Sequence, residues 1–598
     1  MKTQLSPQKR DSGFALMMVM AMTAISIMAM SSALNWAYGN AKLNDRNNEF
    51  FKAEAAAEAG TEKVMSQVIK DFQRDGEATV YANLGTYQSA PPNTTESSYW
   101  SDWTFNNGAG TAGRIGVSRI VDWAFVELNS QYKGLNGLAA TYAVVSNVRR
   151  NSGNSGIVGA VRQEFQVANI PIFQFAIFYG LTMEISCGQP FNITGRVHSN
   201  KDIYTCPDNT LTFFTDVTAV GNISFGRAPG DSRSAPSGTV TYQAKHDSKT
   251  ASLTLPIGTN NSPAAVRAII EVPPSDEAAN STMGKQRFFN QADMILTATN
   301  NISYTFSTNI SGGRTTITTN ASTNFSIYAT SGRADAFATV ITSADVAKFA
   351  SLSAGFVDNR EARTVKPITV DVTAFSNWSA TNVLLRTLIG GDVRILYVND
   401  GRNLIDQNAN LNAVRLTNGA TLPAQGLTIA TERPVYIQGD YNASGTALGT
   451  TNTTATKPAA ILADAVTVLS KAWTDKNSTN TVANRDATTN TVNAALLAGI
   501  VETLTYNSYS GGAENYQRFL EDWGTGRTYT YNGSMVILFP SKYATGKWGQ
   551  GEVYAPPPRN WAFDLNFTQS TKLPPGTPQM RVLIRGQWAH AAPGPVPY

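Results

Sequence analysis

The N-terminal segment, from Met1 to Gly60, constrains the fold more than any other part of the chain. From Phe14 to Leu34 no side chain is charged, and six of the residues are methionine. About 20 apolar residues in a helix span the hydrocarbon core of a bilayer. Lys2, Lys9 and Arg10 precede this run, and basic residues on one flank favour that end in the cytoplasm. We therefore expect one membrane helix, with the rest of the chain outside the cytoplasm.

The same helix is expected to continue beyond the membrane. Residues 49–60 are rich in alanine and glutamate, which favour helix. Apolar side chains then recur at helical spacing: Val64, Met65, Val68, Ile69 and Phe72. The pattern predicts a single helix over residues 14–72, whose second half lays one apolar stripe on a globular part.

Three interpretations of the N-terminus remain open. A cleaved secretory signal would need a small-residue site, for which Ala29-Met30-Ser31 is a weak candidate. A permanent membrane anchor is the second. The third is a leader over residues 1–13 that is cleaved on the cytoplasmic side, between Gly13 and Phe14. A short basic leader that ends in glycine, before an apolar helix that does not stop, favours this third interpretation.

Two segments carry a family resemblance. Gly13-Phe14-Ala15-Leu16, together with residues 50–60, resembles the start of PilX-type pilin-like proteins and of GspK-like minor pseudopilins. The resemblance covers the chain roughly as far as Lys70. It implies processing by a prepilin peptidase, contact with an inner-membrane assembly platform, and packing against other pilin-like subunits. The positions it assigns to the assembly helix are Met18, Phe50, Phe51, Glu54, Glu58 and Gly60.

Met18 departs from the pattern of the main filament subunits. Major pilins carry glutamate at the fifth mature position, which is Met18 here. The GspK-like family also lacks this acid and lies at a filament tip. The resemblance therefore implies a minor, initiating or tip-located subunit rather than a repeating one.

Residues 73–180 predict a small antiparallel sheet. Alternating apolar and polar residues at 120–126, 142–148 and 159–167 are typical of half-buried strands. We expect this sheet to pack on the end of the long helix, as in a pilin-like module.

The following residues indicate a parallel β-helix, or β-solenoid. One constant offset aligns Phe191 with Leu211, Ile193 with Phe213, Val197 with Val217, and Ile203 with Ile223. Short apolar segments separated by Gly and Asn turns are typical of solenoid rungs. Similar segments recur at 426–429, 433–440, 460–470 and 494–500. The predicted class is mainly β with a long N-terminal α-helix, a solenoid-like head over 181–225 and 421–598, and an α+β insertion over 226–420.

The insertion and the C-terminal block carry local predictions. Residues 344–350 and 378–388 have helical patterns. Tyr516, Phe519, Leu520 and Trp523 lie at helical spacing and predict a short amphipathic helix. Asn532-Gly533 predicts a hairpin turn or a solenoid corner. Four C-terminal motifs also resemble those of large PilX-like envelope proteins, at residues 519–523, 531–534, 559–564 and 573–578.

The composition weighs against several functions. The formal net charge is +4, and no basic patch favours nucleic acid as a partner. The three histidines are too scattered for a metal cluster. No cofactor motif is present. Cys187 and Cys206 lie 19 positions apart, and in an exported chain such a pair predicts a disulfide.

An enzyme is the least favoured class. Parallel β-helices include polysaccharide-cleaving enzymes, whose paired carboxylates act as general acid and base. The candidates are Asp440, Asp464, Glu502, Asp522 and Asp564, but nothing in the sequence places any two together. We predict a non-enzymatic subunit of a type IV pilus or a type II secretion system. It would be held in the bacterial inner membrane with its head in the periplasm, or lie at the cell surface after assembly. A surface adhesin that binds glycan is the alternative.

Overall fold

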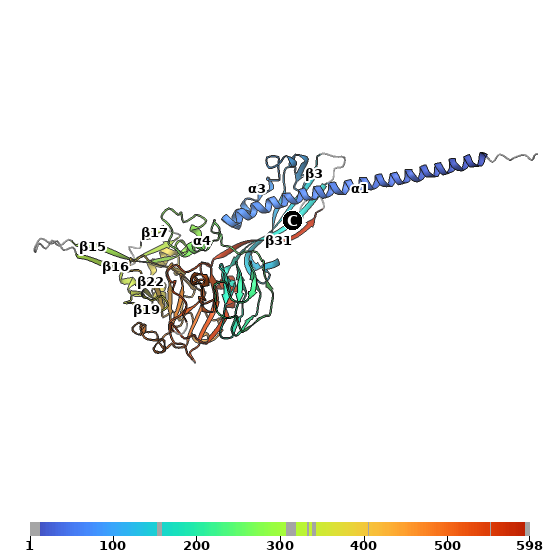
Figure 1. The fold of residues 1–598 in the computed structure, drawn as a ribbon. Helices are drawn as coiled ribbons and strands as arrows, with labels where there is room; N and C mark the ends of the chain where they lie inside the picture. Colours follow the sequence, from blue (N-terminus) through green and yellow to red (C-terminus); the bar gives the residue numbers. More distant parts are fainter. Residues whose placement is uncertain are drawn as a thin grey trace, which may run out of the picture.

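The computed structural model describes residues 12–151, 158–305, 318–331, 334–337, 343–404, 406–524, 526–549 and 552–591. The predicted leader, residues 1–13, lies outside this range except for its last two positions. The predicted fold class is confirmed. A long N-terminal helix is followed by an antiparallel sheet and several parallel sheets (Figure 1).

The N-terminal helix α1 runs unbroken from Ser12 to Asp75. It contains the predicted range of 14–72 and begins outside the body of the molecule, as Figure 1 shows. Two short helices follow it, α2 (Glu77–Ala82) and α3 (Leu84–Gln88).

The antiparallel sheet has five strands, in the order β1–β3–β4–β31 with β2 paired to β3. The three strands predicted from residues 73–180 are present. The strands are β1 (Trp103–Asn106), β2 (Gly116–Glu127), β3 (Asn136–Arg150), β4 (Val158–Pro171) and β31 (Gln579–His590). We call α1 to α3 and these five strands the helix-and-sheet module.

Strand β31 corrects the predicted domain boundary. The sequence pattern predicts residues 579–590 as part of the solenoid, but they pair antiparallel with β4, from Gln579 opposite Pro171 to His590 opposite Val161. Alternate side chains of β31 are buried, namely Met580, Val582 and Ile584. The solenoid is therefore an insertion between the last two strands of the helix-and-sheet module. We call residues 172–578 the head.

The head begins with a three-sided parallel coil. One turn of the coil leads from Phe191 to Leu211, and the four predicted residue alignments are those observed between neighbouring strands. The strands are β5 (Ile177–Tyr179), β6 (Met183–Ile185), β7 (Phe191–Ile193), β8 (Val197–Ser199), β9 (Ile203–Thr205), β10 (Thr210–Phe213), β11 (Val217–Ala219), β12 (Ile223–Phe225), β13 (Thr239–Tyr242) and β14 (His246–Asp247).

The remaining strands form two larger sheets. The first runs β15–β21–β23–β25–β27–β29, and the second runs β20–β22–β24–β26–β28. The strands are β15 (Met294–Thr305), β16 (Thr318–Ser331), β17 (Ala334–Phe337), β18 (Ala350–Leu352), β19 (Phe356–Asp358), β20 (Arg363–Asp371), β21 (Ile395–Asp400), β22 (Asn410–Thr417), β23 (Leu427–Ala430), β24 (Val435–Gln438), β25 (Ala459–Ala463), β26 (Val466–Leu469), β27 (Asn490–Ala498), β28 (Arg518–Phe519), β29 (Tyr529–Ile537) and β30 (Arg559–Phe563).

Residues 226–420 are not the self-contained insertion that was predicted. Residues 239–247 complete the three-sided coil, and 363–371, 395–400 and 410–417 supply strands to the larger parallel sheets. The predicted helices at 344–350 and 378–388 correspond to shorter elements. The helices of this region and the rest of the head are α4 (Pro263–Arg267), α5 (Phe288–Gln291), α6 (Ser343–Val346), α7 (Val372–Thr381), α8 (Val383–Ile389) and α9 (Thr503–Tyr506).

The order of strands in space differs from their order in the chain. Strand β29 pairs in parallel with β27 on one side and on the other with β5, the first strand of the head. Met535 N donates to the Ala176 carbonyl at 2.8 Å across this seam. The chain thus enters the head in the middle of the stack, runs to one end, crosses through residues 248–293, and returns from the other end.

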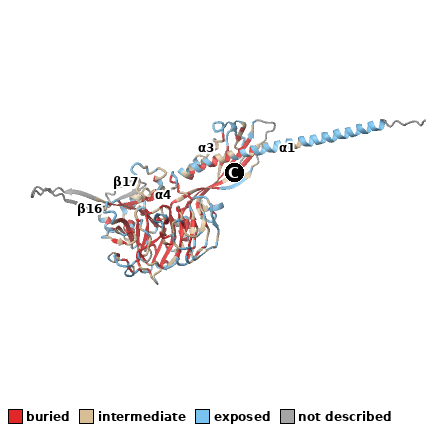
Figure 2. Cartoon of the chain, viewed as in Figure 1, coloured by how far each residue is buried: buried red, intermediate tan, exposed pale blue. Residues whose placement is uncertain are grey.

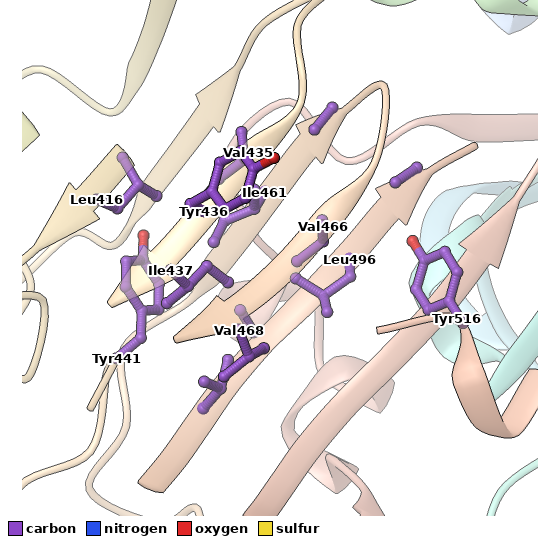
Figure 3. Close-up of a cluster of buried hydrophobic side chains, with 14 of the residues drawn as sticks. Leu416, Val435, Tyr436, Ile437, Tyr441, Ile461, Val466, Val468, Leu496 and Tyr516 are labelled. Atoms are coloured by element: carbon purple, nitrogen blue, oxygen red, sulfur yellow. The ribbon is translucent and has the colours of Figure 1, made fainter. Parts of the chain in front are cut away.

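The sheet that contains β25 and β27 is buried on both faces. Ile461 and Leu496 point into the interior, where they meet Val435, Ile437 and Val468 from the opposite sheet (Figure 3). The alternate residues belong to a second cluster, together with the 253–292 segment and the antiparallel sheet. Double burial explains why these strands are continuous apolar runs in the sequence. Buried residues accordingly fill the head in Figure 2.

Two local predictions in the C-terminal block are wrong. Residues 516–523 contain strand β28 instead of an amphipathic helix, because all four apolar side chains point into buried surroundings. Asn532 and Gly533 lie inside β29 rather than in a turn. A Cβ at Gly533 would lie 2.0 Å from the Ala494 carbonyl oxygen, so glycine is required for strand packing there.

The predicted disulfide is not formed, because Cys187 and Cys206 are separate buried thiols. The spacing of the two cysteines is one position shorter than the repeat of the coil, which aligns Val197 with Val217. Cys206 N donates to the Ile185 carbonyl, and Asp208 N donates to the Cys187 carbonyl, so the two cysteines are out of register. Burial raises the pKa of each thiol to about 12.

Asp464, which follows β25, joins the crossing segment (residues 248–293) to residues 542–544 after β29. Its carboxylate accepts three backbone N–H groups from residues 542–544, at 2.6–3.0 Å, and pairs with Arg267 of α4 at 2.7 Å. Both side chains are buried. Removing one partner of a buried ion pair leaves the other charge uncompensated.

We predict that Asp464→Asn lowers the free energy of unfolding of the head by about 3 kcal/mol. Urea unfolding followed by tryptophan fluorescence measures this loss. Asp276→Asn, which removes a carboxylate at an exposed position, is the matched control and should change the midpoint little. An equal, small change in both variants would show that the Asp464 pair does not hold the crossing segment.

Glu521 predicts a pH dependence of stability. It is buried, accepts hydrogen bonds from Ser470 N at 2.6 Å and Ser470 Oγ at 2.7 Å, and burial raises its pKa to about 7. An unfolded glutamate has a pKa of about 4.3, so the folded state binds more protons between these values. Stability therefore falls as pH rises from about 4 to 7.

Replacement of Glu521 by Gln removes the loss of stability that ionisation of Glu521 causes. We expect the stability of Glu521→Gln to exceed that of the wild type by an amount that grows to about 3 kcal/mol at pH 8. Unfolding midpoints between pH 4 and 8 test this, with the exposed Glu552→Gln as control. Parallel pH profiles for the wild type and Glu521→Gln would contradict it.

Candidate functional site: the N-terminal helix and its seat

The first half of α1 projects away from the rest of the described residues (Figure 1). Every residue from Gly13 to Tyr38 is exposed, although most of these side chains are apolar (Figure 2). By length and composition this helix could cross a membrane. Exposure of so much apolar surface marks a region that contacts a membrane or other chains.

The second half of α1 is seated on the antiparallel sheet. Val64, Met65, Val68 and Phe72 pack against buried residues of β2, β3 and β4. Nearer the exposed half of α1 the contact uses small side chains: Ala53, Ala56 and Ala57 meet a second apolar cluster. Four residues of the apolar stripe predicted from the sequence thus form the seat of the helix, whereas the fifth, Ile69, is exposed.

Two glycines allow the helix to approach the sheet closely. A Cβ at Gly159 on β4 would lie 2.5 Å from the backbone carbonyl carbon of Ala53 and 2.6 Å from the nitrogen of Glu54. A Cβ at Gly60 would lie 2.6 Å from Ser146 Oγ on β3. Helix backbone and strand backbone are therefore in contact at Gly159, which leaves no room for another residue type.

Strand β31 ties the helix to the sheet with polar contacts along its length. Arg581 donates to the carbonyls of Phe72 and Gln73, at 2.9 and 2.8 Å, where α1 ends. Arg585 Nη2 donates to Glu62 Oε2 at 2.7 Å. His590 Nδ1 lies 2.5 Å from Glu54 Oε1. We call Arg581, Arg585 and His590 the C-terminal clamp.

Electrostatics support the clamp at its middle contact. The hydrogen bonds from Arg585 lower the pKa of the Glu62 carboxyl. The contact is partly exposed, so its contribution to stability is modest and screened by salt. Its role is geometric, since it holds the middle of the seated half of α1 beside β31.

A buried cluster follows the C-terminal end of α1. The Glu77 carboxylate, 8% exposed, accepts from Arg119 at 2.8 Å and from the Tyr142 hydroxyl at 2.7 Å. Burial and the bond to Glu77 raise the pKa of Tyr142. These contacts fix α2 on the sheet. Gly76, whose φ is +89°, separates α2 from α1.

The residues predicted for the assembly helix fall into two groups. Phe14, Met18, Phe51 and Glu58 are exposed, and Phe50 is partly covered by the His590 ring. Glu54 and Gly60 instead face the molecule's own sheet and clamp. Gly13 lies within α1, with open space around its Cα.

Four of the five carboxylates considered for catalysis are engaged in local structure. Asp440 accepts from Thr491 N at 2.8 Å, Asp522 from Gly524 N at 2.9 Å, and Asp564 from Thr453 Oγ1 at 2.7 Å. Asp464 holds the crossing segment. Glu502 differs, because it lines a cavity together with Glu184.

The sequence did not indicate the clamp. Its three residues lie at the far end of the chain from their partners in α1, and no local pattern of charges connects the two. Alternating apolar residues at 580–584 could have indicated a strand. Its pairing with β4 had no sequence signal, because the whole head separates them.

Comparison with known proteins gives little. No family model matches the chain, and no curated protein matches its sequence. Among solved structures, the crystal structure of the competence-associated pilin ComZ from Thermus thermophilus matches 90% of this chain and 97% of that chain. The sequence identity is 10% and the TM-score is 0.29. A likeness at this level does not establish a shared fold.

We predict that Gly159→Ala loosens the seat of the helix, because its Cβ meets backbone atoms rather than a movable side chain. The expected cost is about 1–3 kcal/mol. Amide hydrogen exchange over residues 53–72 should become faster by the corresponding factor. Gly85→Ala in α3, where an added Cβ meets nothing within 4 Å, should leave exchange unchanged. Unchanged exchange in Gly159→Ala would show that the close approach is unimportant.

Proposed function

We propose that this protein is a non-enzymatic, minor pilin-like subunit of a type IV pilus or a type II secretion system, assembled through α1. The observation that carries the proposal is the division of α1 into two halves. One continuous helix is exposed and apolar at its start and seated on an antiparallel sheet at its end. A simple membrane anchor would need only the exposed first half of α1. A helix seated rigidly on its own sheet also fixes how a neighbouring chain can dock.

The size of the head supports a minor role. Residues 172–578 form one large body beyond the sheet, on the side away from the exposed half-helix (Figure 1). A subunit repeated along a shaft would need room for this body at every step. A single copy at a tip or at the base of the machine would not. Met18, in place of an acidic residue, agrees with such a position.

The proposal names partners and a location. A prepilin peptidase would cleave after Gly13 and leave Phe14 as the mature N-terminus. The exposed half-helix would lie in the bacterial inner membrane until assembly, with the head in the periplasm, and would then pack against other pilin-like subunits. An inner-membrane platform would drive the assembly.

The N-terminus of the mature protein tests this proposal. We expect protein isolated from membranes to begin at Phe14, and a bulky replacement of Gly13, such as Gly13→Leu, to leave the leader attached. Gly39→Leu is the matched control, because Gly39 also lies in α1 with open space around it. A mature end near Ser32, an intact wild-type leader, or normal processing of Gly13→Leu would contradict the proposal.

The adhesin alternative is tested by removing the head alone. Deletion of everything after residue 180 would also remove β31 and the clamp, so loss of assembly would have two explanations. Ile172 N donates to the Pro578 carbonyl at 3.0 Å, so the two ends of the head lie side by side. Residues 173–577 can therefore be replaced by an Asn-Gly turn, with β4 and β31 retained.

Two outcomes of the excision are informative. If filaments or secretion persist and binding to cells or glycans is lost, the head is an adhesin carried by the helix-and-sheet module. If assembly fails while residues 53–75 remain protected from hydrogen exchange, the head itself takes part in assembly.

A further inference from the structure

The last turn of the three-sided coil has no strand beyond it. This turn, which we call the terminal turn, consists of β12, β13 and β14, and each of them is the end strand of its sheet among the described residues. The loop after β12 does not cover the turn, because it folds back along the coil. Its Arg227 Nη1 donates to Ser186 Oγ at 2.6 Å and to the Cys206 carbonyl at 2.9 Å, in the two preceding turns. No residue from 239 to 249 is buried.

The hydrophobic core of the coil is open at the terminal turn. Val240 and Tyr242 of β13 align with Leu211 and Phe213 of the preceding turn. Leu211 and Phe213 are buried, whereas Val240 and Tyr242 pack on the same core but are half-exposed. A repeat protein normally ends in a capping repeat with a polar outer face. The coil instead ends in an apolar surface that one more strand would cover.

The three edges of the terminal turn differ in how far they are protected. On β12, the Ile223 N–H donates to Ser248 Oγ at 3.0 Å, so this edge is partly closed. Strand β14 has only two residues and is flanked by Lys245 and Lys249, and charged side chains at an edge oppose further pairing. Strand β13 has the sequence Thr-Val-Thr-Tyr, without a charge and with a high preference for β structure. The edge of β13 is therefore the one that can accept another strand.

The backbone of β13 has hydrogen-bonding groups available at this edge. Thr239 N and Gln243 N donate to carbonyls of the preceding turn, at 3.1 and 2.9 Å. Successive residues of a strand direct their N–H and C=O groups to opposite sides. Val240 and Tyr242 therefore direct theirs to the open edge. An edge with unpaired backbone groups and an uncovered apolar face is a template for strand addition.

The orientation of the head indicates which chain can reach this edge. In Figure 1 the coil lies at the end of the head towards which the exposed half of α1 projects, whereas β15 and β16 lie at the opposite end. A chain that packs along the exposed half of α1 therefore lies on the same side of the molecule as the terminal turn.

We propose that an extended segment of a neighbouring pilin-like subunit adds a parallel or antiparallel strand to the free edge of β13. Its backbone pairs with Val240 and Tyr242, and its alternate apolar side chains cover these two residues. The neighbour comes from the proposed function, on which this contact rests. The contact goes beyond that function because the head, and not only α1, binds the neighbour.

Photo-crosslinking in intact cells that make the full-length protein tests this contact. Neighbouring strands lie about 4.8 Å apart, so a crosslinking amino acid at the exposed Thr241 lies beside the added strand. We expect an adduct with a pilin-like subunit, which mass spectrometry locates in an extended segment. Val240→Pro removes an outward N–H, and proline is tolerated on edge strands. It should reduce the adduct roughly tenfold, as the loss of one hydrogen bond implies.

Two further variants separate the edge from the fold. Val240→Ala shortens the same side chain but keeps the N–H, so the adduct should remain. Val240→Lys keeps every backbone group and places a charge on the apolar surface, so the adduct should be lost. An equal adduct in the wild type, Val240→Pro and Val240→Lys overturns the proposal, as does an adduct with a second copy of this chain. The same adduct from the exposed Asp276, in the crossing segment, would show mere proximity and also overturns it.

A crosslinking amino acid at Met28 in α1 reports on the proposed function separately. Adducts from Met28 without adducts from Thr241 overturn the strand addition and leave the assembly role of α1 intact. Absence of protein adducts from both positions overturns both.

Discussion

The pairing of β31 with β4 is the contact on which the rest of the structure depends. It brings the last strand of the chain back, after the whole of the head, to the sheet that carries the N-terminal helix. Through this pairing the C-terminal end of the head, like its N-terminal end, joins the helix-and-sheet module. Arg581, Arg585 and His590 on the same strand hold the helix. The head is therefore held at both of its ends, and its position relative to the helix is fixed by backbone hydrogen bonds.

A second constraint is the outer face of the large parallel sheet. Strands buried on one side only would alternate apolar and polar residues, but β25 is apolar throughout and β27 is apolar from Ala494 to Ala498. Their outer side chains pack with the crossing segment and with residues of the antiparallel sheet, such as Ile170 and Met580. The helix-and-sheet module thus serves as one wall of the head, and the two parts share a core.

Local sequence patterns predicted much of this fold, but they could not predict strand pairings between distant parts of the chain. The alignment of Phe191 with Leu211 was correct because each rung of the coil repeats the same inward positions. The stripe at 64–72 was correct because helical spacing puts those residues on one face. By contrast, β31, the seam between β5 and β29, and the strands within 226–420 depend on partners that are distant in the chain. The helix predicted over 516–523 is wrong because four buried residues at helical spacing also fit a strand and its flanking turns.

The candidate sites also divide into features with a local sequence signal and features without one. The exposed start of α1 was evident from its charge-free run, and the structure adds the seat, the close approach at Gly159 and the clamp. The cavity that Glu184 and Glu502 line had no sequence signal, because Glu184 is a single acid in an otherwise apolar strand and its neighbours come from distant segments. The predicted disulfide failed because Cys187 and Cys206 miss the register of the coil by one position.

The central claim is that the exposed half of α1 assembles with other chains while the seated half does not. Photo-crosslinking in intact cells tests it most directly, with a crosslinking amino acid placed at Met28, Tyr38 or Phe51 on the exposed surface, or at Ala56 against the sheet. We expect crosslinks to pilin-like proteins from the three exposed positions, and only intramolecular crosslinks from Ala56. Exposed positions that crosslink to lipid alone, with no protein partner, would contradict it.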